Sequence, residues 1–312
     1  MTITSPAAEQ HATLGTRIVD FARDIKLSHT VFALPFALLS TFLGPRTLFD
    51  EGKFPTPWPT AGQLLLIVLC MVTARTVAMA SNRLLDADLD SRNPRTARRA
   101  LPSGRLSRRF FVAALVGCAI AFVAGTSLFG FIYRNWLPLI LSLPVLAFIG
   151  SYPLLKRFTQ LCHYYLGASL ALAPICAWIA ITGRVDVEPL LMAGAVLCWT
   201  AGFDIIYACQ DFACDREQGL FSVPSRIGIG PALWVSRATH VIALAMLIAL
   251  GWRSSELAIL YFIGVWITAA LLFVEHTLVR PGDLSKVGMA FFLMNGIISL
   301  ALGTLGILDV FF

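Results

Sequence analysis

The sequence predicts an all-α integral membrane protein, on the basis of its composition and the length of its apolar runs. Of its 312 residues, 57% are hydrophobic and 13% are charged, and the mean hydropathy is +0.77. Soluble domains average about 45–50% apolar and about 25% charged residues, because a surface in water needs polar side chains. The composition therefore excludes an ordinary cytosolic enzyme, a nucleic-acid-binding module and a disordered chain, and we expect no nucleic-acid partner.

Nine apolar runs predict about nine transmembrane helices packed as a bundle. Each run is close to the ~20 residues that cross a bilayer, and Pro, Gly and charged residues separate them. The weakest boundary is the one between the third and fourth runs, which only Tyr133, Arg134 and Asn135 interrupt. The predicted spans lie at roughly 28–44, 61–81, 110–130, 136–154, 161–182, 189–209, 231–250, 257–275 and 287–308.

The distribution of positive charge predicts which way the bundle faces. With the N-terminus in the cytoplasm, seventeen of the 24 Lys and Arg residues lie on the cytoplasmic side, five lie on the other side and two lie inside spans. Cytoplasmic segments of membrane proteins collect Lys and Arg. We therefore expect a cytoplasmic N-terminal tail over residues 1–27 and a single transmembrane domain over residues 28–312.

A first polar cluster lies at the cytoplasmic end of the second predicted span. Asn82, Asp86 and Asp90 are four residues apart, so they share one face of a helix, and Arg75 lies seven residues earlier on the same stripe. Acids stacked at the C-terminal end of a helix repel each other and oppose the helix dipole, which favours a functional role over a solvated helix end. Two carboxylates and an amide are oxygen ligands that suit Mg²⁺.

A second acidic cluster follows the sixth predicted span. Asp204, Asp211 and Asp215 are seven and four residues apart, again on one stripe. Asp204 lies deep in an apolar run, where an ionisable group is costly and usually functional. Two acidic stripes at the same membrane depth predict a clamp in which divalent cations hold one diphosphate.

Cationic and phenolic residues lie near both clusters. The loop between the second and third spans carries eight arginines, including Arg99, and Tyr152 and Lys156 share a face if the end of the fourth span is helical. Positive-inside topology explains the arginine loop equally well, and interfacial anchoring explains Tyr152 and Lys156 when each is taken alone. Beside two acidic stripes, the set suits a phosphate ligand.

Together these motifs resemble the UbiA superfamily of intramembrane aromatic prenyltransferases, over almost the whole chain. Arg83 departs from the family pattern, since many members carry Asp directly after the motif Asn. The resemblance implies nine transmembrane helices around a central cavity that opens to lipid, with a cytoplasmic cap. It rests on Asn82-xxx-Asp86-xxx-Asp90, Tyr152-xxx-Lys156, Asp211-xxx-Asp215 and Leu101-Pro-Ser-Gly104.

The resemblance also implies an activity, namely Mg²⁺-dependent transfer of a polyprenyl group from polyprenyl diphosphate to an aromatic carboxylate acceptor. The enzyme would act in quinone biosynthesis in a bacterial inner membrane, with its site on the cytoplasmic side. The stretch from Asp204 to Asp211 is similar to bacterial 4-hydroxybenzoate polyprenyltransferases, whose acceptor we prefer. It is equally similar to relatives that prenylate a dihydroxynaphthoate in the futalosine route to menaquinone, so that acceptor stays open.

The resemblance assigns roles to individual residues. The expected metal ligands are Asn82, Asp86, Asp90, Asp204, Asp211 and Asp215. Residues expected to neutralise the diphosphate are Lys156, Tyr152, Arg99 and Lys26. Arg75 is expected to bind the acceptor's carboxylate, and Asp204 to assist loss of the ring proton.

An ion-coupled transporter is the alternative from another class, because intramembrane acids alone would allow an ion path. It does not account for stacked acids that face Tyr, Lys and Arg residues on one side of the membrane. Outside the two clusters, we expect His163 and His240 to be hydrogen-bonded residues of the bundle.

Overall fold

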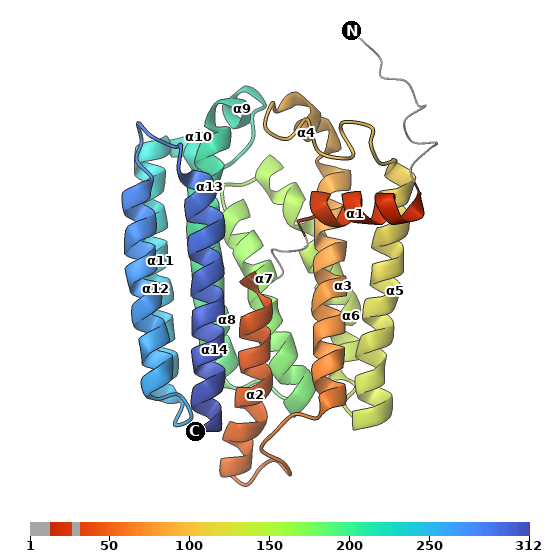
Figure 1. Ribbon diagram of the computed structural model, residues 1–312, viewed down its shortest axis with the longest axis vertical. Coiled ribbons are helices and arrows are strands. Elements are labelled where there is room, and N and C mark those ends of the chain that lie inside the picture. The colour runs from red at the N-terminus through yellow and green to blue at the C-terminus, as the bar shows by residue number, and fades with distance from the viewer. Residues whose placement is uncertain (1–12, 27–31) are drawn as a thin grey trace.

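The computed structural model describes residues 13–26 and 32–312, and every long element in these ranges is an α-helix. Nine long helices run side by side as a bundle, and a shorter one, α1 (Leu14–Asp24), lies across it (Figure 1). The long helices are α2 (Leu34–Asp50), α3 (Ala61–Leu85), α5 (Arg108–Tyr133), α6 (Leu137–Ser151), α7 (Cys162–Thr182), α8 (Val187–Ala208), α11 (Ile229–Arg253), α12 (Ile259–Leu278) and α14 (Asn295–Phe311).

Eight of the nine expected spans are confirmed as helices long and apolar enough to cross a membrane. The remaining span, expected at 28–44, corresponds to α2, which begins only at Leu34 and has 17 residues. At 1.5 Å per residue α2 is ~25 Å long, slightly less than the ~30 Å hydrocarbon core. Residues 27–31, where this span was expected to begin, lie outside the described residues.

The weak boundary between the third and fourth spans is confirmed as a turn. Arg134 adopts a left-handed φ of 62°, which ends α5. Asn135 fixes the turn to a neighbouring helix, because its Nδ2 donates to the carbonyl oxygens of Ile179 at 2.7 Å and Ala180 at 3.0 Å. A hydrogen-bonding side chain, rather than a charged run, therefore separates the two spans.

Three short helices gather at one end of the bundle, which we call the motif end (Figure 1). They are α4 (Ala87–Arg92), α9 (Phe212–Glu217) and α10 (Val223–Ile227), and they connect α3 with α5 and α8 with α11. At the same end α6 continues into a 3₁₀ turn, η3 (Tyr152–Arg157). The motif end therefore carries both acidic clusters.

The segment expected as an N-terminal tail contains α1, which packs against the bundle. Phe21 and Ile25 are buried in a cluster with residues of α3 and α5, and the Phe21 ring meets the Phe111 ring edge-on at 5.2 Å. Residues 1–12 of the expected tail lie outside the described residues. Residues 13–26 belong to the folded domain and end beside the acidic clusters.

Candidate active site

Each acidic stripe bends at its middle residue, Asp86 in the first and Asp211 in the second. The spacing predicted two continuous helical stripes, but α3 ends at Leu85 and α8 ends at Ala208. Asp86 is the N-cap of α4, and Asp211 is the N-cap of α9 after a 3₁₀ turn, η4 (Cys209–Asp211). The expectation of unbroken helices was wrong for a physical reason, since the breaks move the acids to helix starts, where the helix dipole favours negative charge.

Asp86 is almost completely buried, at 1% exposure, and it accepts from two groups through one oxygen. Lys156 Nζ donates to Asp86 Oδ2 at 2.7 Å, and Asn82 Nδ2 donates to the same atom at 2.8 Å. Arg157 reaches the other oxygen at 3.4 Å. The turn η3 therefore presents Lys156 to the first stripe, although this end of α6 is not the α-helix that the Tyr152 and Lys156 spacing had suggested.

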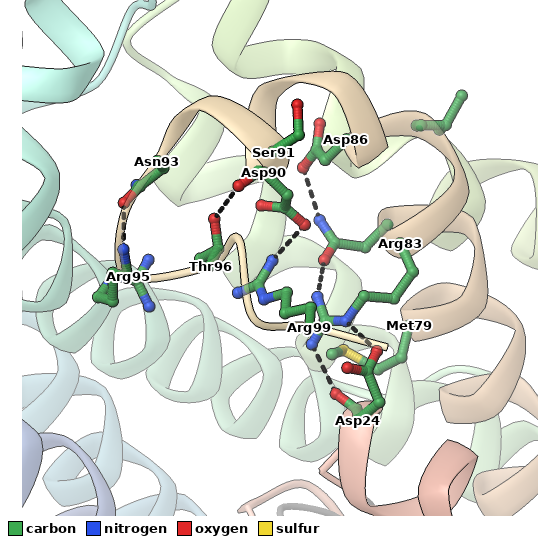
Figure 2. A network of polar contacts seen from close by, with 12 residues as sticks. Asp24, Met79, Arg83, Asp86, Asp90, Ser91, Asn93, Arg95, Thr96 and Arg99 are labelled. Atoms are coloured by element: carbon green, nitrogen blue, oxygen red, sulfur yellow. Dashed lines mark hydrogen bonds and ion pairs between the residues drawn. The ribbon is translucent and has the colours of Figure 1, made fainter. Parts of the chain in front are cut away.

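Asp90 lies one helical turn after Asp86, and it pairs with an arginine from the loop that follows α4. Arg99 Nη1 donates to Asp90 Oδ2 at 2.7 Å, as Figure 2 shows. Thr96 Oγ1 donates to the Asp90 carbonyl oxygen at 3.0 Å, so the loop folds back over α4. Arg99 therefore lies where the sequence predicted it, next to the carboxylates.

The loop after α4 also reaches across to the second stripe. Arg95 Nε donates to Asp211 Oδ1 at 2.9 Å, and Asn93 Nδ2 donates to the same oxygen at 2.8 Å. A second nitrogen of Arg95, Nη1, donates to the Tyr207 hydroxyl at 2.8 Å. The two acidic segments are thereby joined across the motif end by direct polar contacts.

Asp204 contacts a histidine that the sequence had assigned to the bundle alone. His163 Nδ1 lies 2.7 Å from Asp204 Oδ2, and His163 Nε2 accepts the Val223 backbone N–H at 3.1 Å. Because Nε2 accepts, Nδ1 carries the proton and donates to Asp204. His163 is hydrogen-bonded, as expected, but it belongs to the site.

A cavity of about 290 Å³ lies between the two stripes. The described residues that line it include all eleven candidate site residues, which come from α3, α4 and the segments flanking it, α8, η4, α9, η3 and the segment after α1. These are Lys26, Arg75, Asn82, Asp86, Asp90, Arg99, Tyr152, Lys156, Asp204, Asp211 and Asp215.

A second cavity of about 160 Å³ adjoins the first and is lined almost entirely by apolar side chains of α3, α5, α6 and α7. The two cavities share Arg75, Met79, Tyr152, Leu166 and Leu170 as lining residues. A polar chamber at the motif end therefore leads into an apolar one that runs deeper into the bundle.

Arg75 lies at the junction of the two cavities. Its Nη2 donates to the Lys26 carbonyl oxygen at 3.4 Å, and its Nε is buried without a hydrogen-bond partner in the described part of the chain. A guanidinium whose donors are not all used can take a further acceptor, such as a carboxylate.

Lys26 enters the cavity directly after α1, with a left-handed φ of 50°. Burial lowers the pKa of Lys26 from its ordinary value, and three nearby guanidinium groups lower it further. These groups belong to Arg99, Arg83 and Arg95. The cavity wall on this side therefore carries concentrated positive charge.

The carboxylates provide oxygen ligands for Mg²⁺, although no cage exists in advance. Among residues 13–26 and 32–312, no three His, Cys, Asp or Glu side chains form a group that would hold a metal ion. Mg²⁺ does not need such a group, because it keeps several waters and takes one or two carboxylates together with phosphate oxygens. Asp86 and Asp90 on one wall and Asp204 and Asp211 on the other fit that requirement. Asn82 is different, because its oxygen accepts from Arg83.

Comparisons with known proteins match most of the chain. The chain matches the UbiA prenyltransferase family over residues 33–297. It is 30% identical over 263 residues to the 4-hydroxybenzoate octaprenyltransferase of Marinobacter nauticus, covering 83% of this chain and 84% of that protein. It is also 30% identical over 264 residues to the mitochondrial 4-hydroxybenzoate polyprenyltransferase of Drosophila melanogaster, covering 80% of this chain but only 63% of that protein.

Solved structures share the fold. A UbiA homolog from Aeropyrum pernix K1 is 31% identical with a TM-score of 0.78, over 91% of this chain and 98% of that one. A UbiA homolog from Archaeoglobus fulgidus bound to DMAPP and Mg²⁺ is 18% identical with a TM-score of 0.70, over 93% of this chain and 99% of that one.

Proposed function

Because the chain belongs to the UbiA prenyltransferase family, we propose that it transfers a polyprenyl group from polyprenyl diphosphate to an aromatic carboxylate acceptor. The first acceptor to test is 4-hydroxybenzoate, because two relatives at 30% identity carry the name 4-hydroxybenzoate polyprenyl- or octaprenyltransferase. A dihydroxynaphthoate is the alternative. The observation that carries the proposal is the continuity of a charged cavity with an apolar one. This arrangement suits a molecule with a diphosphate head and an isoprenoid tail.

The diphosphate head would lie between the two acidic stripes. Asp86, Asp90, Asp204, Asp211 and Asp215 would hold Mg²⁺ ions, which would neutralise the charge of the leaving diphosphate. The relatives bound to DMAPP or GPP together with Mg²⁺ support this cofactor.

Cations of this chain would neutralise the rest of the diphosphate charge. Lys156, Arg99 and Lys26 line the same cavity, and Tyr152 lines both this cavity and the apolar one. As the C1–O bond breaks, negative charge grows on the departing diphosphate, and cations fixed in advance stabilise it without reorganising. The apolar chamber would hold the tail and keep water from the allylic carbocation.

The acceptor ring would lie deeper than the diphosphate, near Arg75. Arg75 would pair with the acceptor's carboxylate, and a ring carbon ortho to the phenol hydroxyl would form the new C–C bond. That carbon would then lose its proton, which Asp204 would accept. The hydrogen bond from His163 holds Asp204 in position.

We further propose that the motif end faces the cytoplasm of a bacterial cell, at the inner membrane. The arginine-rich loop between α3 and α5 lies at this end, and seventeen of the 24 Lys and Arg residues fall on the corresponding side. The positive-inside rule supports this orientation.

One experiment tests the activity and identifies the acceptor. Membranes that contain the protein are incubated with labelled polyprenyl diphosphate, Mg²⁺ and either 4-hydroxybenzoate or a dihydroxynaphthoate, and the lipid-soluble product is identified by mass spectrometry. Transfer to 4-hydroxybenzoate supports the preferred acceptor, and transfer to the naphthoate alone supports the alternative. Absence of transfer to any aromatic acceptor, with the Asp86→Ala variant as background, would reject the proposed activity.

A further inference from the structure

Arg83 is a buried arginine that connects the site to α1. Its side chain is 3% exposed, and that of Asp24 is 5% exposed. Arg83 Nε donates to Asp24 Oδ2 at 3.0 Å, and Nη2 donates to the Asp24 carbonyl oxygen at 2.9 Å. One edge of the guanidinium is therefore fixed to the C-terminal end of α1 (Figure 2).

The remaining Arg83 nitrogen, Nη1, donates to Asn82 Oδ1 at 2.5 Å. The Asn82 amide nitrogen then donates to Asp86 Oδ2 at 2.8 Å. The opposite orientation of the amide would turn NH₂ toward a guanidinium and oxygen toward a carboxylate, and both contacts would be repulsive. Arg83 therefore determines that Asn82 offers a donor, and not an oxygen, to Asp86.

Asp24 is itself held in place from two directions. Its Oδ1 accepts the Ala100 backbone N–H at 2.7 Å, which fixes it to the loop that carries Arg95 and Arg99. Phe21, one turn earlier, packs edge-on against Phe110 and Phe111 of α5. Two hydrogen bonds to Asp24 therefore connect Arg83 to the C-terminal end of α1.

We infer that Arg83, anchored by Asp24 of α1, is a positioning residue that locks the Asn82 amide and so orients the Asp86 carboxylate toward the cavity. Asn82 acts here as a holder of Asp86, and the metal ligands are the carboxylates. This inference rests on the proposed function for the identity of the ligand, but the chain Asp24–Arg83–Asn82–Asp86 exists independently of it.

Arg83→Lys is the main test, because a lysine can pair with Asp24 but has no planar fork to reach Asn82 at the same time. Binding of geranyl diphosphate with Mg²⁺ is measured by calorimetry on the purified full chain, together with the thermal unfolding midpoint. We expect the protein to stay folded, with its midpoint lowered by the loss of roughly one charge-assisted hydrogen bond, and we expect the Kd to rise about tenfold. An unchanged Kd in a folded Arg83→Lys protein would overturn the inference.

The Asn82→Asp variant distinguishes a residue that holds Asp86 by a hydrogen bond from a residue that binds the metal. If residue 82 were a metal ligand, the variant would still bind Mg²⁺, because a carboxylate binds Mg²⁺ at least as well as an amide oxygen does. A residue that holds Asp86 could not be exchanged in this way, because the new carboxylate faces Asp86 without a donor. We expect weaker binding of Mg²⁺ and geranyl diphosphate, and binding as tight as wild type would overturn the inference.

A readout without ligand keeps this test separate from the proposed function. In a double-mutant cycle of Arg83→Lys and Asn82→Ala, we expect the shifts of the unfolding midpoint to be non-additive, because the two side chains share one hydrogen bond. Additive shifts would count against the inference even if the protein bound no diphosphate at all. Failure of the wild type to bind geranyl diphosphate, with a non-additive cycle, would reject only the proposed function.

A control uses a less buried ion pair at the opposite end of the bundle. Arg46 Nε lies 3.2 Å from Glu256 Oε2, between α2 and the loop before α12. Arg46→Met with Glu256→Gln should leave the Kd for geranyl diphosphate unchanged. A Kd shift equal to that of Arg83→Lys would show a general effect of losing an ion pair and would overturn the inference.

Discussion

Asp86 and Asp211 occupy the same backbone position in the two halves of the protein. Each is the N-cap of a six-residue helix, with φ and ψ of −97° and 5° at Asp86 and −98° and 7° at Asp211. Each is followed four residues later by another carboxylate, Asp90 or Asp215. The helices α4 and α9 lie at the same end of the bundle (Figure 1), so the two stripes form two walls of one cavity.

Activity should depend on both walls. Asp86→Ala, Asp90→Ala, Asp204→Ala and Asp211→Ala should each lower turnover at least ~100-fold, the scale on which lost electrostatic stabilisation acts. Turnover is measured with labelled donor in membranes, and immunoblots check that each variant inserts. Full activity in any two variants, or in excess chelator, would contradict a metal-bridged diphosphate.

The motif end should face the cytoplasm. Ser103 and Ser255 are exposed and lie at opposite ends of the bundle, so single cysteines at these positions in a cysteine-free background should be labelled from opposite sides. Impermeant maleimide applied to intact cells should label Ser255→Cys but not Ser103→Cys. The reverse pattern would invert the orientation, and labelling of both from one side would contradict the number of spans.

Arg75 should matter more for the acceptor than for the donor. Arg75→Lys removes the planar fork, and loss of a buried charge-assisted pair costs roughly 2–5 kcal/mol. The apparent KM for the aromatic acceptor should therefore rise steeply, while the KM for prenyl diphosphate changes little. If the donor KM rises instead, Arg75 belongs to the phosphate site and the acceptor lies elsewhere.

Donor binding should weaken at alkaline pH because of Lys26. Burial and the nearby guanidinium groups lower its pKa, so Lys26 loses its charge at a lower pH than an ordinary lysine does. The KM for prenyl diphosphate should rise as the pH increases through that lowered pKa. Lys26→Arg keeps its charge throughout this range and should abolish the rise, whereas Lys286→Arg, at an exposed site, should not. The same alkaline rise in Lys26→Arg would exclude Lys26 as its cause.

Hydropathy predicted the bundle because each span must be apolar along its length to lie in lipid. Spacing placed Asp86 and Asp90 on one wall because residues four apart stay neighbours even where the helix bends. The contacts of His163 and Arg95 were not predictable in this way. Arg95 meets Asp211 across 116 positions of sequence, and nothing in the local pattern distinguishes it from the other arginines of its loop.

The same limit applies to α1. Its pairing with Arg83 spans 59 positions, so the segment appeared to be a polar tail. The departure of Arg83 from the family pattern did indicate a missing contact. A positive charge beside the motif Asn needs an acidic partner when it is buried. Its partner could be found only in three dimensions.

The pairing of carboxylates with cations of the chain has a consequence for how substrate enters. Asp86 faces Lys156, Asp90 faces Arg99 and Asp211 faces Arg95, so each of these three carboxylates already has a cation of the chain beside it. A free diphosphate would meet the carboxylates, and a free divalent cation would meet the arginines. We therefore expect the preassembled magnesium salt of the diphosphate, which offers each set a partner of opposite charge, to bind more readily than either ion alone.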